Sequence, residues 1–163
     1  TKGGQVYYAD LDGSTGVALV ELAHLATFPE PAKADNDIGW CNLQWPPTMT
    51  AAPGTTTPLA FGQVWVDTVT SGTGQGAGIT AQLGWGAASG TPRADAFTWT
   101  SAAWNADSGN NDEYKASFVA PVAGTYRYVY RVRRDKGWSY CDTDGSTGAA
   151  EFDPAKSGVL TVQ

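Results

Sequence analysis

The clearest pattern in the chain is a run of alternating side chains at residues 124 to 133. One face of an extended segment there would carry Tyr126, Tyr128, Tyr130 and Val132, and the pattern predicts a half-buried strand. The opposite face would carry three arginines, which we expect to be solvated: Arg127, Arg131 and Arg133. Turn residues at 135 to 137 and renewed alternation at 138 to 141 predict a hairpin.

Further short strands are expected along the rest of the chain. They fall at residues 38–45, 61–70, 79–86, 97–100, 113–120 and 158–163. Loops rich in Gly, Pro, Thr and Ala separate them, and the polar stretch 101–112 is expected to be a turn. Seven or eight such strands are typical of a two-sheet antiparallel sandwich, so the expected fold class is all-β.

Residues 1–36 differ from the remainder and are interpreted as an ordered N-terminal extension, with the sandwich domain at residues 37–163. Residues 5–9 could form a short strand, and 10–16 a polar loop. The apolar stretch 17–28 favours a strand over a helical turn, and it needs a covering surface for Val17, Leu19, Val20 and Leu22. It either folds back onto its own domain or adds to a sheet edge of the next subunit, which would build a self-associating chain.

Composition narrows the function classes. The 163 residues suit one domain, and the formal net charge of −6 argues against binding to a phosphate backbone, so nucleic acid is not an expected partner. No run of eighteen apolar residues occurs, so no membrane span is expected. Thr1 is interpreted as a processed or trimmed start.

The chain contains two cysteines, Cys41 and Cys141, each beside an aromatic residue in an expected strand. Two thiols in an acidic, Trp-rich β protein suggest an oxidising compartment, and we predict that they form a disulfide. The alternative is two buried free thiols. A zinc site is not expected, because two Cys and the single His24 supply too few ligands.

Two D-x-D-G-S-T-G motifs carry the sharpest chemical signal. Alternate carboxylates before a glycine resemble the first half of a calcium loop, so the candidate Ca²⁺ ligands are Asp10, Asp12, Asp142 and Asp144. Neither motif supplies the glutamate that closes an EF-hand loop, and turns of this composition are common without metal. Calcium is therefore the possible cofactor, and a plain turn is the alternative.

Seven tryptophans could supply flat platforms for sugar rings. Trp104 and Trp138 lie beside expected loops and are the candidates for ligand binding. The others considered are interpreted as core or inter-sheet residues: Trp40, Trp45, Trp85 and Trp99. No nucleophile elbow, metal-binding histidine motif or phosphate-binding loop occurs, so no catalytic residue is assigned and an enzyme is not expected.

A resemblance to a known family rests on four runs of sequence: IGWCNLQWPP, GQVWVDTVT, GAGITAQLGWG and AGTYRYVYRVRRDKGWSYCDTDGSTG. Together, residues 38–163 resemble a fibronectin-III/Ig-like β-sandwich module of large secreted bacterial proteins. The resemblance implies the fold and a secreted, extracellular or cell-surface location, and it implies no reaction. The first functional hypothesis is a structural subunit that self-assembles through the N-terminal segment. The second is a carbohydrate-binding module that recognises a polysaccharide.

Overall fold

The structure is a computed structural model, and it describes residues 8–9, 15–16, 38–89, 92, 96–135, 137–145 and 154–163. The chain divides into two compact units, Thr1–Glu30 and Pro31–Gln163, each described by itself. In the first unit, β1 (Tyr8–Ala9) pairs antiparallel with β2 (Thr15–Gly16). The calcium candidates Asp10 and Asp12 lie outside the described residues, as do the assembly candidates Val17, Leu19, Val20 and Leu22. The predicted domain boundary after residue 36 stays a prediction.

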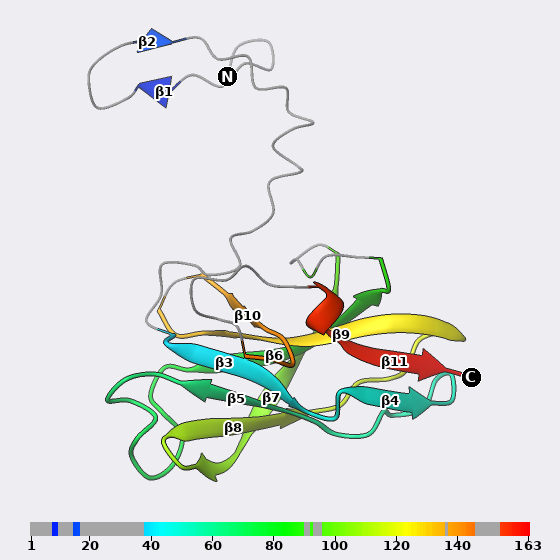
Figure 1. The fold of residues 1–163 in the computed structure, drawn as a ribbon, viewed down its shortest axis with the longest axis horizontal. Helices are drawn as coiled ribbons and strands as arrows, with labels where there is room; N and C mark the ends of the chain where they lie inside the picture. The colour runs from blue at the N-terminus through cyan, green and yellow to red at the C-terminus, as the bar shows by residue number, and fades with distance from the viewer. Residues whose placement is uncertain are drawn as a thin grey trace. The chain divides into compact units, whose positions relative to one another are not determined.

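The second unit is one curled sheet of nine strands (Figure 1). The strands are β3 (Trp40–Trp45), β4 (Thr48–Ala51), β5 (Ala60–Trp65), β6 (Thr80–Ala87), β7 (Thr98–Ser108), β8 (Asn111–Ala116), β9 (Gly124–Arg133), β10 (Ser139–Cys141) and β11 (Gly158–Val162). A 3-10 turn, η1 (Pro154–Lys156), precedes the last strand. The described residues contain no α-helix, so the all-β class is confirmed.

The strand order is β3-β5-β8-β7-β6-β9-β11-β4, and β10 also pairs with β9. The predicted hairpin between β9 and β10 is confirmed, with Tyr140 opposite Arg131. One pair departs from the expected antiparallel sandwich, because β11 runs parallel to β4. Such a pair needs a long connection between its strands, which a pattern of local hairpins does not reveal. The sheet is therefore mixed, and the Ig or fibronectin-III arrangement stays a prediction.

Two segments expected to be loop or turn are strands. Residues 48–51 form β4, and β7 continues through the polar stretch to Ser108. The small and polar residues of β7 suit a strand with one side toward solvent, and only the tip of its hairpin with β8 turns. Gly109 lies at that tip with a φ of +65°, a conformation that favours glycine.

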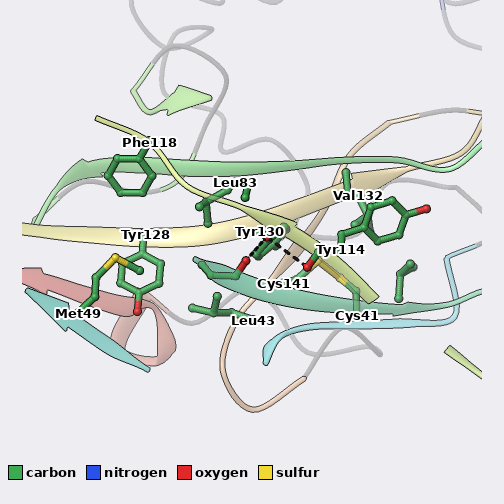
Figure 2. Packing of buried hydrophobic residues seen from close by; sticks show 14 of the residues in the cluster. Cys41, Leu43, Met49, Leu83, Tyr114, Phe118, Tyr128, Tyr130, Val132 and Cys141 are labelled. Carbon is green, nitrogen blue, oxygen red and sulfur yellow. Dashed lines mark hydrogen bonds between the residues drawn. A yellow bond between two sulfur atoms is a disulfide. The ribbon is translucent and has the colours of Figure 1, made fainter. Parts of the chain in front are cut away.

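The core lies inside the curl, between the two halves of the sheet. Figure 2 shows Tyr130 at its centre, where the Tyr130 hydroxyl donates to the Ala60 carbonyl over 2.7 Å. The Tyr130 ring also lies against Gly62 of β5, where an added Cβ would come within 2.7 Å of the ring. The face of β9 expected to be buried thus contacts the core: Tyr128, Tyr130 and Val132 are buried, and Tyr126 is partly buried. The hydrogen bond from the Tyr130 hydroxyl joins β9 to β5 across the core.

Cys41 of β3 and Cys141 of β10 form a disulfide, as predicted, across a sequence separation of 100 residues. Both residues are fully buried, and Figure 2 shows their sulfurs bonded beside Tyr114. The Leu43 amide donates to the Asp142 carbonyl over 2.7 Å, next to this bridge. The edge strand β3 is therefore tied to the far side of the sheet, and the curl is nearly closed.

Candidate functional site

A band of polar and aromatic side chains covers the side of β3, β5, β8 and β7 that faces away from the core. Buried and partly exposed residues alternate in the first three of these strands, as expected when one side meets the core and the other meets solvent. We call the outward side the amide face. The residues used below are Trp40, Asn42, Trp45, Phe61, Gln63, Trp65, Asn105, Ser108, Asn111, Glu113 and Lys115.

The middle of the amide face is a hydrogen-bonded network centred on Gln63. The Gln63 side-chain Nε2 donates to Ser108 Oγ over 2.8 Å, and its Oε1 accepts from Asn111 Nδ2 over 3.1 Å. The Gln63 backbone N–H donates to Asn42 Oδ1 over 3.2 Å. Residues from four neighbouring strands thus fix the amide groups in one orientation, and polar groups held in place bind a ligand at a low entropic cost.

The aromatic side chain most exposed on this face is Trp45, at 62%. It lies opposite Phe61, immediately after a register shift between Leu43 and Trp45. The interpretation of Trp45 as a core residue is therefore wrong. The extra residue at the shift breaks the alternation of β3, so the last residue of the strand joins the outward side.

Two partly exposed tryptophans lie at the opposite end of the same strands, where Trp40 of β3 is paired with Trp65 of β5. Each ring lies against a glycine. A Cβ on Gly39 would lie 2.3 Å from the Trp65 ring, and one on Gly145 would lie 2.6 Å from Trp40 Nε1. The amide network therefore lies between two aromatic ends.

The charges on the amide face are few and of both signs. Glu113 and Lys115 alternate with buried residues on β8, and Asn105 of β7 donates a hydrogen bond from its Nδ2 to Glu113 Oε1. One acid and one base leave this surface close to neutral, although the chain carries a net charge of −6. An uncharged ligand with many hydroxyl groups would suit such a surface.

Trp104, a candidate for ligand binding, is not beside a loop. It lies within β7 opposite Tyr114 of β8, and its partly buried ring packs against the core cluster. Its small and polar neighbours belong to a strand rather than to the expected turn. That placement leaves Trp104 as a poor platform for a ligand, although its binding role stays a prediction.

Trp138, the other candidate, lies on the outward side of the other half of the sheet. The Arg131 guanidinium carbon lies 4.2 Å from the centre of the Trp138 ring and 3.9 Å from that of Trp99. Arg133 also lies against Trp138, at 4.6 Å. The expectation of a solvated arginine face is wrong for Arg131, which is 7% exposed. One of the two indole rings that cover it, Trp138, comes from the same hairpin, and the other, Trp99, comes from β7.

Asp142 and Asp144, the calcium candidates within the described residues, make separate contacts. Asp142 Oδ1 accepts a hydrogen bond from the Gly145 amide over 3.1 Å, which closes the turn. Asp144 forms an ion pair with Lys156, with 3.7 Å between Oδ2 and Nζ. No cluster of three His, Cys, Asp or Glu side chains occurs among the described residues. Calcium binding at Asp142 and Asp144 stays a prediction.

A buried carboxylate holds the Gly-rich loop 71–78 against the sheet. Asp112 of β8 is fully buried, and its Oδ2 accepts a hydrogen bond from the Gly76 amide over 2.7 Å. Burial raises the pKa of Asp112, while the Gly76 amide and the Trp104 and Tyr114 side chains act in the opposite direction. Burial also raises the pKa of Tyr114 to about 12. This network gives the loop a fixed attachment point.

These features define a disulfide-bonded, all-β module with one polar and aromatic outer face. In comparisons with known proteins, the chain is similar to segments of bacterial amylopullulanases. It is 28% identical over 173 residues to the protein of Thermoanaerobacter thermohydrosulfuricus, covering 93% of this chain and 11% of that protein. It is 35% identical over 98 residues to the protein of Thermoanaerobacterium thermosulfurigenes, covering 51% of this chain and 5% of the relative.

A third amylopullulanase, of Thermoanaerobacterium saccharolyticum, is 33% identical over 99 residues, which cover 52% of this chain and 8% of that protein. The chain therefore corresponds to a small part of each of these three relatives. No protein-family model matches the chain. In the described part of the chain, no helix is long and apolar enough to cross a membrane.

Proposed function

We propose that this chain is a non-catalytic polysaccharide-binding module that accompanies a glycan-degrading enzyme. The observation that carries the proposal is the amide face, where the exposed Trp45 lies beside an ordered row of amide side chains. Aromatic rings offer apolar surface to the faces of sugar rings, while fixed amides can exchange hydrogen bonds with sugar hydroxyls.

The comparisons support the choice of ligand. The relatives are named amylopullulanases, and the matched segment covers 5 to 11% of their length. A segment that small suits an accessory module rather than a catalytic domain. The name of these relatives points to an α-glucan, such as starch or pullulan. The Cys41–Cys141 disulfide supports a secreted, extracellular module, because such bonds persist in oxidising compartments.

Binding to insoluble starch tests the proposal. The purified chain is incubated with starch granules, and the protein left in solution is measured. Cellulose is the control, because its glucose units are joined by β-linkages instead of the α-linkages of starch. We expect depletion by starch and none by cellulose. Retardation in gels that contain amylopectin or pullulan provides a second readout with soluble polymer. A chain that neither sediments with starch nor is retarded by either polymer contradicts the proposed function.

The hypothesis of self-assembly through the N-terminal segment has no support from the described residues or from the relatives. Its candidate residues lie outside the described part of the chain. We therefore advance only the polysaccharide-binding function.

A further inference from the structure

We infer that the amide face binds a single uncharged glucan chain laid along β3 and β5, so that both aromatic ends contact the same chain. This inference rests on the proposed function and adds the position, length and charge of the ligand. It assigns the exposed Trp45 and Phe61 to one end of the bound chain, Trp40 and Trp65 to the other, and the amide network to the middle.

The spacing of the aromatic ends sets the length of the ligand. Trp40 and Trp45 are the first and last residues of β3, and a strand rises about 3.3 Å per residue. The paired residues Trp65 and Phe61 are four positions apart on β5, and the extra residue in β3 adds little length, so the two ends are separated by about 13–16 Å, which a chain of about three or four sugar rings would span. A disaccharide could contact only one end and part of the amide row, so affinity should rise with chain length up to that limit.

Gln63 lies midway between the two aromatic ends and fixes the orientation of the hydrogen-bonding groups there. It lies two residues from Phe61 and two from Trp65 on β5, and both polar atoms of its side-chain amide are hydrogen-bonded, Nε2 to Ser108 and Oε1 to Asn111. Removal of the Gln63 side chain would therefore release both neighbours. The middle of the site would lose its order while the aromatic ends remained.

The charge on the face selects against ionic polymers. Glu113 and Lys115 are the charged side chains of β8 on this surface, and they carry opposite signs. A polyanion would meet Glu113, and a polycation would meet Lys115, without a surplus of opposite charge to offset either repulsion. An uncharged polysaccharide meets neither penalty.

Calorimetric titration with malto-oligosaccharides of two to seven units tests the inference on the intact chain. We expect affinity to rise about tenfold or more from two units to about four, and then to level off. Trp45→Ala and Gln63→Ala should each weaken binding of the longest sugar about tenfold or more, as loss of a residue that carries much of the binding energy does. Trp138→Ala, the same chemical change on the other half of the sheet, should leave affinity within about twofold.

Thermal melts of each variant establish that a lost affinity does not reflect unfolding. Equal affinity for two and seven units overturns the two-ended site, even if starch binding is retained. Loss of binding in Trp138→Ala with retention in Trp45→Ala places the site on the other half of the sheet. A change of mass by light scattering in Trp45→Ala, without a change in sugar affinity, shows that a second copy of the chain occupies the face. If the unaltered chain binds no α-glucan of any length, the proposed function itself fails.

Discussion

A glycine of β6 determines how Trp99 of β7 lies on the sheet. Gly84 lies opposite Trp99, and a Cβ at Gly84 would come within 2.3 Å of the Trp99 ring. The ring therefore lies flat on the backbone of β6, from where it covers Arg131. Glycine at this position serves close packing, because any side chain would lift the indole away from the sheet.

Replacement of Gly84 by alanine is predicted to lower the free energy of unfolding by about 1–3 kcal/mol, the usual cost of overpacking. Gly72→Ala is the matched control, because no heavy atom lies within 4 Å of a Cβ added there. Urea unfolding of both variants, followed by tryptophan fluorescence, measures the difference. Equal stability of the two variants would show that Trp99 can move aside at no cost.

Single residues also show which features a sequence can reveal. Cys41 and Cys141 could be paired because the chain has no other cysteine. Trp45 was misplaced because one extra residue in β3 shifts the alternation, and the burial of Arg131 depends in part on Trp99, which lies outside its hairpin. Periodicity reports the environment of a residue within its own strand. It carries no information on the side chains of other segments that pack against that residue in the folded protein.

At the scale of an element, the burial of Asp112 between β8 and loop 71–78 makes stability depend on pH. The folded state raises the pKa of Asp112, chiefly through burial. The folded protein therefore holds this proton more tightly than the unfolded chain, in which the pKa of Asp112 is near its ordinary value of 3.8. The stabilising contribution of the protonated group is fully present below that value, and it is lost as the pH rises through the raised pKa.

Comparison with Asp112→Asn isolates this contribution, because asparagine does not titrate. Relative to the variant, the unaltered protein should gain stability as the pH is lowered from 7 toward 4. Asp107, which also raises the pKa of Asp112, is present in both proteins and its direct effects largely cancel in the difference. Chemical unfolding at a series of pH values provides the measurement. A difference that instead favours the unaltered protein increasingly toward neutral pH has the wrong sign for a raised pKa.

Elements were predicted best where their two sides differ in chemistry. The strand β9 alternates between tyrosine and arginine, and its hairpin with β10 follows from the turn residues between them. The continuation of β7 to Ser108 could not be seen, because a strand whose side chains are mostly small and polar has the composition of a turn. The sequence did not reveal the amide face either. Its residues are individually ordinary, and only the pairing of four strands brings them together.

At the scale of the whole molecule, the disulfide joins the two ends of the curled sheet. The enclosed segment is about 100 residues long, and the loop-entropy treatment gives such a bond roughly 4–5 kcal/mol of stabilisation. Reduction is therefore predicted to lower the midpoint of urea unfolding markedly. The double variant Cys41→Ala/Cys141→Ala should start from the lower midpoint and not respond to reductant. An unaltered midpoint after complete reduction would mean that the sheet holds its closure without the bond.

The parallel pairing of β11 with β4 has a consequence for the order of synthesis. The strand β11 lies between β9 and β4, and it provides the hydrogen-bonding partners of both. While the chain emerges from the ribosome, the edges of β9 and β4 that pair with β11 remain unpaired until residues 158–162 have been made. Unpaired edges are templates for association between chains. The nascent module therefore passes through a stage in which it is prone to aggregate, and this stage ends only when the five residues of β11 have been translated and have paired with β9 and β4.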